Sequence, residues 1–320
     1  MLARIRIILV LALLVALAVV SGGAPFASDH DDTDPLKAIP RHDARLTDLF
    51  AFTEGDRLVL ILCTNPAIPK SAGSYQQPAD LVLRFHLSSR CKVSFDDPQA
   101  TTQFGGTIKH PEKIAPEHTL QVTFDAAGAP TLTSDIGAHL ANTRIFSGLR
   151  DDPFIRGPRA ERNVAAIVVE TPLSAFTERG DTLLIWATTS VPSALGPVGD
   201  LGGRSLRSQL TENLALNDFS PAEHFTVLGV RPDVVIFDTT RPAGFPNGRA
   251  LDDDVVDLVG DARILATDAP FPSANDRSFL AVFPYLAEPH APCGVTGLAC
   301  CAVGEACGGG SSCSSGICAP

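Results

Sequence analysis

The stretch "LVLRFHL" at residues 81–87 decides the fold class of this chain. Apolar residues stand at positions 81, 83, 85 and 87, and Arg84 and His86 fall between them. Because successive side chains of a strand point to opposite faces, this alternation predicts a half-buried β-strand. The sequence "TLQVTFDAAGAPTLT" at residues 119–133 alternates in the same way on both sides of a glycine-containing turn, so it predicts a hairpin.

Four further segments are continuous apolar or β-branched runs bounded by Gly, Pro, Asp or Asn: "RLVLILC" (57–63), "NVAAIVVE" (163–170), "TLLIWATT" (182–189) and "DVVIFD" (233–238). Such runs predict strands that are buried on both faces. Helical signals are confined to residues 205–216 and 251–265. We therefore expect a mainly β domain of two packed sheets, a sandwich or a distorted barrel, with two or three short helices.

An apolar leader opens the chain. Residues 7–20 form an uninterrupted apolar run that follows Arg4 and Arg6 and precedes the small residues "SGGAPFA". A membrane-spanning helix needs about 20 apolar residues, and this run is shorter. The pattern predicts a secretory signal peptide at residues 1–27 and a secreted, periplasmic or cell-surface protein. An uncleaved signal anchor is the alternative.

The charge of the chain limits its partners. The leader carries two of the 25 basic residues and none of the 36 acidic ones, so the remaining chain has a formal charge of −13. Such a surface repels phosphate backbones and anionic lipid, which argues against nucleic-acid partners and membrane-surface binding. The sequence has no Walker loop and no G-x-G-x-x-G, so no nucleotide cofactor is expected, and no familiar catalytic signature decides whether the protein is an enzyme.

Cysteines divide the chain after its leader. We expect a β-rich domain at 28–288, a linker at 289–292 and a disulfide-stapled tail at 293–320 that contains Cys293, Cys300, Cys301, Cys307, Cys313 and Cys318. These six cysteines can pair in many ways, and their spacing does not choose among them. Zinc binding by the tail is an alternative, and attachment to the cell surface or to a protein partner is its expected use. Cys63 and Cys91 are left to pair with each other inside the domain.

Two acidic motifs offer metal ligands in the first half of the chain. The head "SDHDDTD" at 28–34 combines carboxylates with the imidazole of His30, although a solvated lead-in explains the same composition. In "GLRDDPF" at 148–154, Arg150 can pair with Asp151 or Asp152 to pin the loop. The other carboxylate would then be available to a cation or a substrate.

Two motifs follow in the second half. "GFPNGRALDDDVVD" at 244–257 places Arg249 before three consecutive acids, of which one can cap a helix and the others need Arg249, a cation or solvent. "NDRSFLAVFPYLAEP" at 275–289 is expected to close the core with its aromatic residues, and Trp186 is expected to be core as well.

Together these motifs resemble a bacterial secreted family catalogued as domain of unknown function 4331. The matching stretches are the "SDH" head, "LTDLFAF" (46–52), "GLRDDPF", "NVAAIVVETPLS" (163–174), "GFPNGRALDDDVVD" and "NDRSFLAVFPYL" (275–286), in the family's order. The resemblance spans about residues 28–288 and implies export and a β-rich fold, but no established activity. The chain departs from the family pattern at 155–157 and 202–213, and the tail lies outside the resemblance.

Two hypotheses of function follow. In the first, an exported β domain binds a hard divalent cation, Ca²⁺ above all, through Asp151, Asp152, Asp253 and Asp254. In the second, the protein is a metal-dependent enzyme whose head, with His30, Asp31 and Asp48, joins these carboxylates around Zn²⁺, Mn²⁺ or iron. Arg150 or Arg249 would then orient an anionic substrate.

Overall fold

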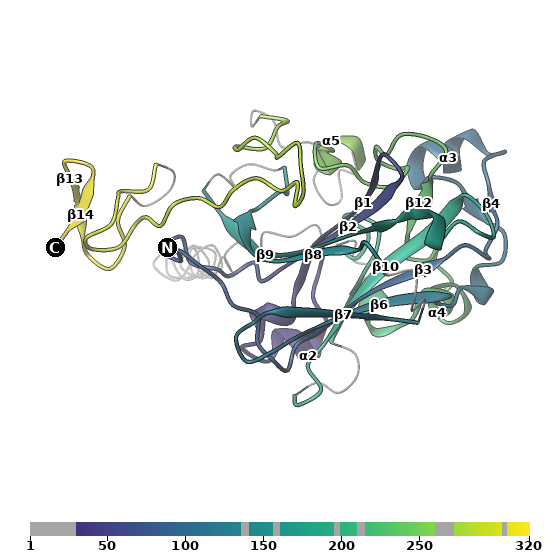
Figure 1. The fold of residues 1–320 in the computed structure, drawn as a ribbon, viewed down its shortest axis with the longest axis horizontal. Coiled ribbons are helices and arrows are strands. Elements are labelled where there is room, and N and C mark those ends of the chain that lie inside the picture. The colour runs from purple at the N-terminus through teal and green to yellow at the C-terminus, as the bar shows by residue number, and fades with distance from the viewer. Residues whose placement is uncertain are drawn as a thin grey trace, which may run out of the picture.

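The computed structural model describes residues 30–135, 141–155, 161–194, 199–209, 215–259, 272–302 and 306–320. The predicted signal peptide lies outside these residues. Two antiparallel sheets form the body of the protein (Figure 1). The first has the strand order β1 (Leu46–Glu54), β2 (Arg57–Thr64), β9 (Asn163–Pro172) and β8 (Arg144–Asp151). The second has the order β11 (Asp200–Gly202), β10 (Thr182–Ser190), β3 (Val82–Ser88), β6 (His118–Phe124) and β7 (Pro130–Ser134), and β12 (Val235–Asp238) also pairs with β10.

The strands predicted from period-two patterns are confirmed. In β3, Leu83, Phe85 and Leu87 are buried while Arg84 and His86 are half-buried, as the alternation requires. The hairpin is formed by β6 and β7, with Phe124 opposite Pro130 at its closed end. The prediction of a mainly β fold with two packed sheets is therefore correct, and the described residues contain four short α-helices where two or three were expected.

The main core lies between the two sheets. Alternate residues of β2 (Leu58, Leu60, Leu62) and β9 face alternate residues of β3 and β10 in one cluster of buried side chains. Burying apolar surface between two sheet faces is the principal stabilising term in a fold of this kind.

Each sheet is also covered on its outer face, which explains the continuous apolar runs. Val164, Ala166 and Val168 of β9 pack beneath Tyr285 and Leu286, so the "NDRSFLAVFPYLAEP" motif closes a second core as expected. On the far side of the second sheet, Leu184 and Trp186 of β10 belong to a third cluster. Consecutive residues of β9 and β10 are therefore buried alternately in different cores.

Short helices and small strand pairs connect these elements. They are α2 (Asp34–Lys37), α3 (Pro98–Phe104), α4 (Pro221–Thr226) and α5 (Val255–Val259), the 3₁₀ helices η1 (His42–Ala44), η2 (Pro111–Lys113), η4 (Leu173–Ala175) and η6 (Leu216–Asp218), and the pair β4 (Val93–Ser94) and β5 (Thr107–Ile108). None of the helices within the described ranges is long and apolar enough to cross a membrane.

Of the two helix predictions, the first is wrong where the structure describes it and the second is confirmed. The prediction over 205–216 is wrong for residues 205–209, which form turns, because Leu206 adopts a left-handed φ of 61° that an α-helix does not accept. Residues 210–214 lie outside the described residues. The prediction over 251–265 is confirmed at α5, and residues 260–265 also lie outside.

The cysteine-rich tail sits at one end of the molecule, beyond the sheets (Figure 1). Its disulfides join Cys293 to Cys301, Cys300 to Cys313 and Cys307 to Cys318. Strands β13 (Ser312–Ser314) and β14 (Ile317–Ala319) form a small hairpin within it. The expectation of a disulfide-stapled tail is confirmed, and the structure supplies the connectivity that spacing could not.

The predicted disulfide between Cys63 and Cys91 is wrong, because both residues keep their thiol groups. Cys63 belongs to the core on the outer face of the first sheet, and Cys91 to the core on the outer face of the second. A disulfide requires Cα atoms within about 7 Å of each other, and the main core separates these two faces.

Candidate metal centre

Three potential metal ligands from distant parts of the chain converge at the end of strand β8. Asp151, Asp276 and His290 each offer one ligand atom, and these atoms all lie within 4.8 Å of one another. His290 Nε2 lies 2.8 Å from Asp151 Oδ1 and 3.3 Å from Asp276 Oδ2. The arrangement brings two carboxylates and one imidazole to a common centre.

Backbone pairing fixes the positions of Asp151 and His290. Asp151 is the last residue of β8 and lies opposite Asn163 of β9. The Asn163 side chain brackets the backbone of His290, donating to its carbonyl at 3.2 Å and accepting from its N–H at 2.8 Å. The Asp151 N–H also donates to Ala287 O at 3.4 Å. The first sheet therefore holds the segment that carries His290 against the end of β8.

The third ligand comes from the segment before the aromatic cluster. Asn275 Nδ2 donates to Asp151 Oδ2 at 2.6 Å and to Arg277 O at 3.0 Å, which places Asp276 beside the pair. Asp276 Oδ2 in turn accepts a 2.8 Å hydrogen bond from the backbone N–H of Glu161. Both carboxylates are thus oriented by neighbouring donors before any ion binds.

The electrostatics of Asp151 favour a bound cation. Its side chain is only 1% exposed, and this burial raises the pKa of Asp151 to about 8, although the hydrogen bond from Asn275 opposes the rise. The carboxylates of Asp276 and Asp152 raise the pKa further. A contact of 2.8 Å between Asp151 Oδ1 and His290 Nε2 also requires a proton between the two atoms. A divalent ion could displace that proton and neutralise the carboxylates.

The donor set selects among metals. Carboxylates alone suit Ca²⁺ and Mg²⁺, whereas imidazole suits Zn²⁺, iron, Ni²⁺ and Cu²⁺. Two carboxylates with one imidazole match Zn²⁺ or Mn²⁺ better than the all-oxygen shell of Ca²⁺. Three protein ligands also leave a position for water, as in zinc sites that are open to solvent.

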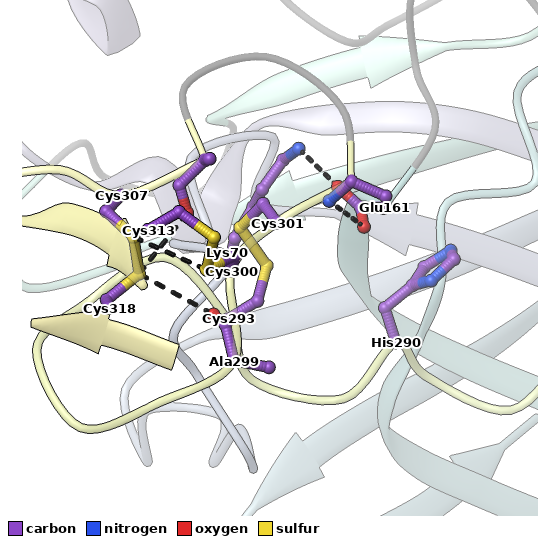
Figure 2. The surroundings of a disulfide bond; sticks show 12 residues. Lys70, Glu161, His290, Cys293, Ala299, Cys300, Cys301, Cys307, Cys313 and Cys318 are labelled. Carbon is purple, nitrogen blue, oxygen red and sulfur yellow. Dashed lines mark hydrogen bonds and ion pairs between the residues drawn. A yellow bond between two sulfur atoms is a disulfide. The ribbon is translucent and has the colours of Figure 1, made fainter. Parts of the chain in front are cut away.

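Two further groups of potential ligands in the described part of the chain contain tail cysteines. Their sulfur atoms are in disulfides, so they cannot bind zinc as thiolates. Glu161 of one group instead ties the tail to the domain: its carboxylate accepts from Lys70 Nζ at 3.2 Å and from the Ala302 N–H at 2.8 Å (Figure 2). The backbone N–H of Cys293 also donates to Lys70 O at 3.1 Å. The predicted linker at 289–292 and the start of the tail are therefore docked on the domain.

The other predicted carboxylates of these loops have structural roles. Asp152 Oδ1 accepts from the Phe154 N–H at 3.1 Å, which stabilises the turn of "RDDPF". Asp253 Oδ2 accepts from the N–H groups of Phe245 and Ala250 at 2.8 and 2.7 Å and so closes the "GFPNGRAL" loop. Asp254 accepts from the Asp257 N–H at 3.3 Å at the start of α5, the cap that one of the three acids was expected to form.

The acidic head is docked on the domain rather than solvated, but at a different place. His30 is buried, with Nε2 3.0 Å from Asp200 Oδ1 and Nδ1 3.1 Å from Ser208 Oγ. Asp31 pairs with Lys37 at 3.0 Å near the surface. Among the described residues, the groups of three potential ligands do not include His30 with Asp151 or Asp253.

The electrostatics of His30 explain why the head stays docked. Burial lowers the pKa of His30, but the adjacent Asp200 carboxylate outweighs it and raises the pKa to about 9. A Cβ at Gly202 would lie 3.0 Å from His30 Nδ1, so the glycine lets the ring pack closely against β11. His30 and Asp200 therefore form a buried ion pair.

Both predicted carboxylate-orienting arginines have partners outside their own motifs. Arg150 pairs with Glu288 at 2.6 Å and lies over the Phe146 ring, instead of pairing with Asp151 or Asp152. Arg249 pairs with Asp48 at 2.8 Å, and its charge also opposes the rise that burial causes in the pKa of Asp253, one of the acids that follow it. The Arg249 backbone forms an isolated bridge with Ala51 of β1, which directs the side chain toward Asp48.

Sequence reasoning found Asp151 but missed Asp276, Asn275 and His290. The first two were read as the polar start of a core-closing motif, and His290 as part of a proline-flanked linker. A usable signal was present, because "NDR" and "EPH" flank the aromatic run that covers the first sheet. The "NDR" and "EPH" segments must therefore lie near the ends of the strands that the aromatic run covers.

Comparisons with models of protein families, with curated proteins and with solved structures find no match for this chain. The resemblance to the secreted family described above therefore rests on the sequence motifs alone.

Proposed function

We propose that this chain is an exported, β-rich binding or structural protein that holds a divalent metal ion, Zn²⁺ or Mn²⁺, at Asp151, Asp276 and His290. The observation that carries the proposal is the convergence of three donor atoms from three separate segments within 4.8 Å. This assignment replaces the expected calcium site, because His290 supplies a nitrogen ligand that Ca²⁺ does not favour.

The metal ion would act as a cross-link. Asp151 belongs to the first sheet, Asp276 to the segment that begins the aromatic cover, and His290 to the segment that leads into the tail. An ion bound to all three would hold the cover and the tail on the sandwich. The tail, fixed in this way, would present its disulfide-bonded hairpin to a protein or cell-surface partner.

Export is supported by two features. The apolar leader has the length and flanking residues of a signal peptide, and the tail contains disulfides, which persist in oxidising compartments. The resemblance to a secreted bacterial family agrees with both.

Elemental analysis of the full chain, purified from periplasm or medium without chelator, tests the proposal. We expect about one equivalent of zinc or manganese, lost in His290→Gln and Asp276→Asn. His110→Gln is the matched control, because His110 forms an exposed pair with Glu112 at 3.3 Å outside the site. Wild-type protein that binds neither zinc nor manganese when either is added, or variants that bind as the wild type does, would overturn the proposal.

A further inference from the structure

A second site is suggested by a cavity of about 290 Å³ beside strand β12, and none of the metal ligands lines this cavity. It lies among the end of α3, strand β5, helix α4 and the loop at residues 229–232. Its walls are largely apolar and include Phe104, Ile108, Phe225 and Ile236. Ligand pockets in proteins are typically about 300–1,000 Å³ and mostly apolar with a few polar groups, so this one suits a small ligand.

Three arginines line the same cavity: Arg204, Arg207 and Arg231. The described residues that line it include no Asp or Glu. The chain as a whole has a formal charge of −11, so this is a local concentration of positive charge on an acidic protein. A cavity of this composition attracts an anion that also has an apolar body.

Arg204 is held in place by aromatic rings. Its guanidinium carbon lies 5.1 Å from the Phe104 ring centroid and 4.9 Å from that of Phe245, and Nη2 donates to Gln103 O at 2.5 Å. Its Nε is buried with no hydrogen-bond partner. The nearby Asp233 carboxylate accepts from the Arg204 backbone N–H at 2.7 Å. Asp233 thus contacts the backbone of Arg204, and its charge opposes the lowering of the Arg204 pKa by burial, while in the described part of the chain the Arg204 guanidinium forms no ion pair with a carboxylate.

Arg231 stands at the solvent side of the cavity. It is exposed, and its guanidinium carbon lies 4.5 Å from the Phe104 centroid. Its backbone carbonyl accepts from Arg207 Nη2 at 3.1 Å, which ties two of the arginine segments together. Within the described ranges, the Arg231 side chain has no carboxylate partner. A stacked guanidinium keeps the N–H groups in its plane able to bind a carboxylate in a bidentate pair.

We infer that this cavity binds a small aromatic carboxylate, with the carboxylate at Arg204 and Arg231 and the ring against Phe104, Phe225 and Ile236. The apolar walls favour this class over an inorganic anion, which would leave them in contact with water or with charge. The size of the cavity suits one ring. The inference is independent of the metal centre, because the two sites share no residue.

Isothermal titration calorimetry of the full chain with benzoate tests the inference, with benzamide as a neutral ligand of the same shape. We expect saturable 1:1 binding of benzoate, at least about tenfold tighter than binding of benzamide, because hydrogen bonds between charged groups are the strong ones. Equal binding of the two ligands, or no binding of benzoate at millimolar concentration, would overturn the inference.

Variants on two walls locate the ligand. Arg231→Gln should weaken benzoate binding about tenfold, and Phe225→Ser should weaken it several-fold, while both keep the wild-type melting temperature because both side chains are exposed. Arg241→Gln is the matched control, because Arg241 also lies over a ring, that of Phe95 at 5.0 Å, outside the cavity. Unchanged affinity in Arg231→Gln, or displacement of benzoate by an equal concentration of phosphate, would contradict the assignment.

Discussion

The side chains of Asp151 and His290 meet with 2.8 Å between Oδ1 and Nε2, and so join the end of strand β8 to the segment that leads into the cysteine-rich tail. Strand pairing places Asp151 opposite Asn163, and Asn163 holds the backbone of His290. The contact is thus built by the first sheet and not by local sequence.

The affinity of this site for a divalent ion should depend on pH. The pKa of Asp151 is raised to about 8, so a proton must leave before a metal binds, and binding should strengthen as pH rises from 6 to 8. Titration calorimetry with Zn²⁺ in two buffers of different ionisation enthalpy should show release of about one proton per ion at pH 7. Identical heats in the two buffers would contradict the arrangement.

The ion pair between Asp48 and Arg249 is expected to matter more for stability than any surface pair. Both side chains are almost fully buried, and the Arg249 guanidinium carbon also lies 4.0 Å from the Phe50 ring centroid. Asp48→Ala leaves a buried charge without this partner and should lower the free energy of unfolding by about 3–5 kcal/mol. Urea denaturation measures the loss.

Two variants serve as controls for that prediction. Lys37→Ala removes the exposed pair with Asp31 and should cost at most about 1 kcal/mol. The double variant Asp48→Ala, Arg249→Met removes both charges and should recover much of the loss. If Asp48→Ala alone lowers the free energy of unfolding by less than about 1 kcal/mol, the ion pair does not stabilise the contact between β1 and the "GFPNGRAL" loop.

The strands were predictable because burial leaves a local trace in the sequence. In β3 the alternation of Leu83 and Phe85 with Arg84 and His86 indicates which face of the strand packs against the core. In β9 the unbroken run reflects two cores, one on each face. Patterns of this kind need only neighbouring residues, so one sequence is enough to read them.

The candidate site was not predictable to the same degree, because long-range pairing decides it. Arg249 was expected to offset the acids that follow it, and its pairing with Asp48, beside the backbone bridge to Ala51, could not be read from its own motif. The head was expected to supply a metal ligand, His30, but His30 Nε2 forms a hydrogen bond with Asp200 of β11. Asp151 was recognised as a candidate metal ligand. Its partners Asp276 and His290 lie in segments that follow the strands of both sheets in sequence, and only the tertiary fold brings these segments to the end of β8.

Chemical labelling should distinguish the two buried thiols from the six tail cysteines. Cys63 and Cys91 are buried on opposite outer faces of the sandwich, so iodoacetamide should modify neither in the native protein. After unfolding without reductant, mass spectrometry should find two modified cysteines per chain, with the others protected in disulfides. Unfolded protein with no modified cysteine would mean that Cys63 and Cys91 are joined after all.

The buried pair of His30 and Asp200 should make stability fall with rising pH. The pKa of His30 is about 9 in the folded protein and about 6.5 when unfolded, so the folded state binds the proton more tightly. The pair's contribution is complete below pH 6.5 and is lost as pH rises through 9, with an upper limit of about 3 kcal/mol.

His30→Gln isolates this contribution, because other groups titrate nearby. Asp151, whose pKa is also raised, lowers the stability of wild type and variant alike as pH rises toward about 8. Burial raises the pKa of Asp32 to about 6 and the His30 charge opposes this rise, so the Asp32 contribution differs between wild type and variant near that pH. The difference in the free energy of unfolding between wild type and His30→Gln is therefore compared at about pH 8 and about pH 10, and it should shrink as His30 loses its proton. A difference that stays constant over this range would show that His30 is neutral in the fold and that packing alone docks the head.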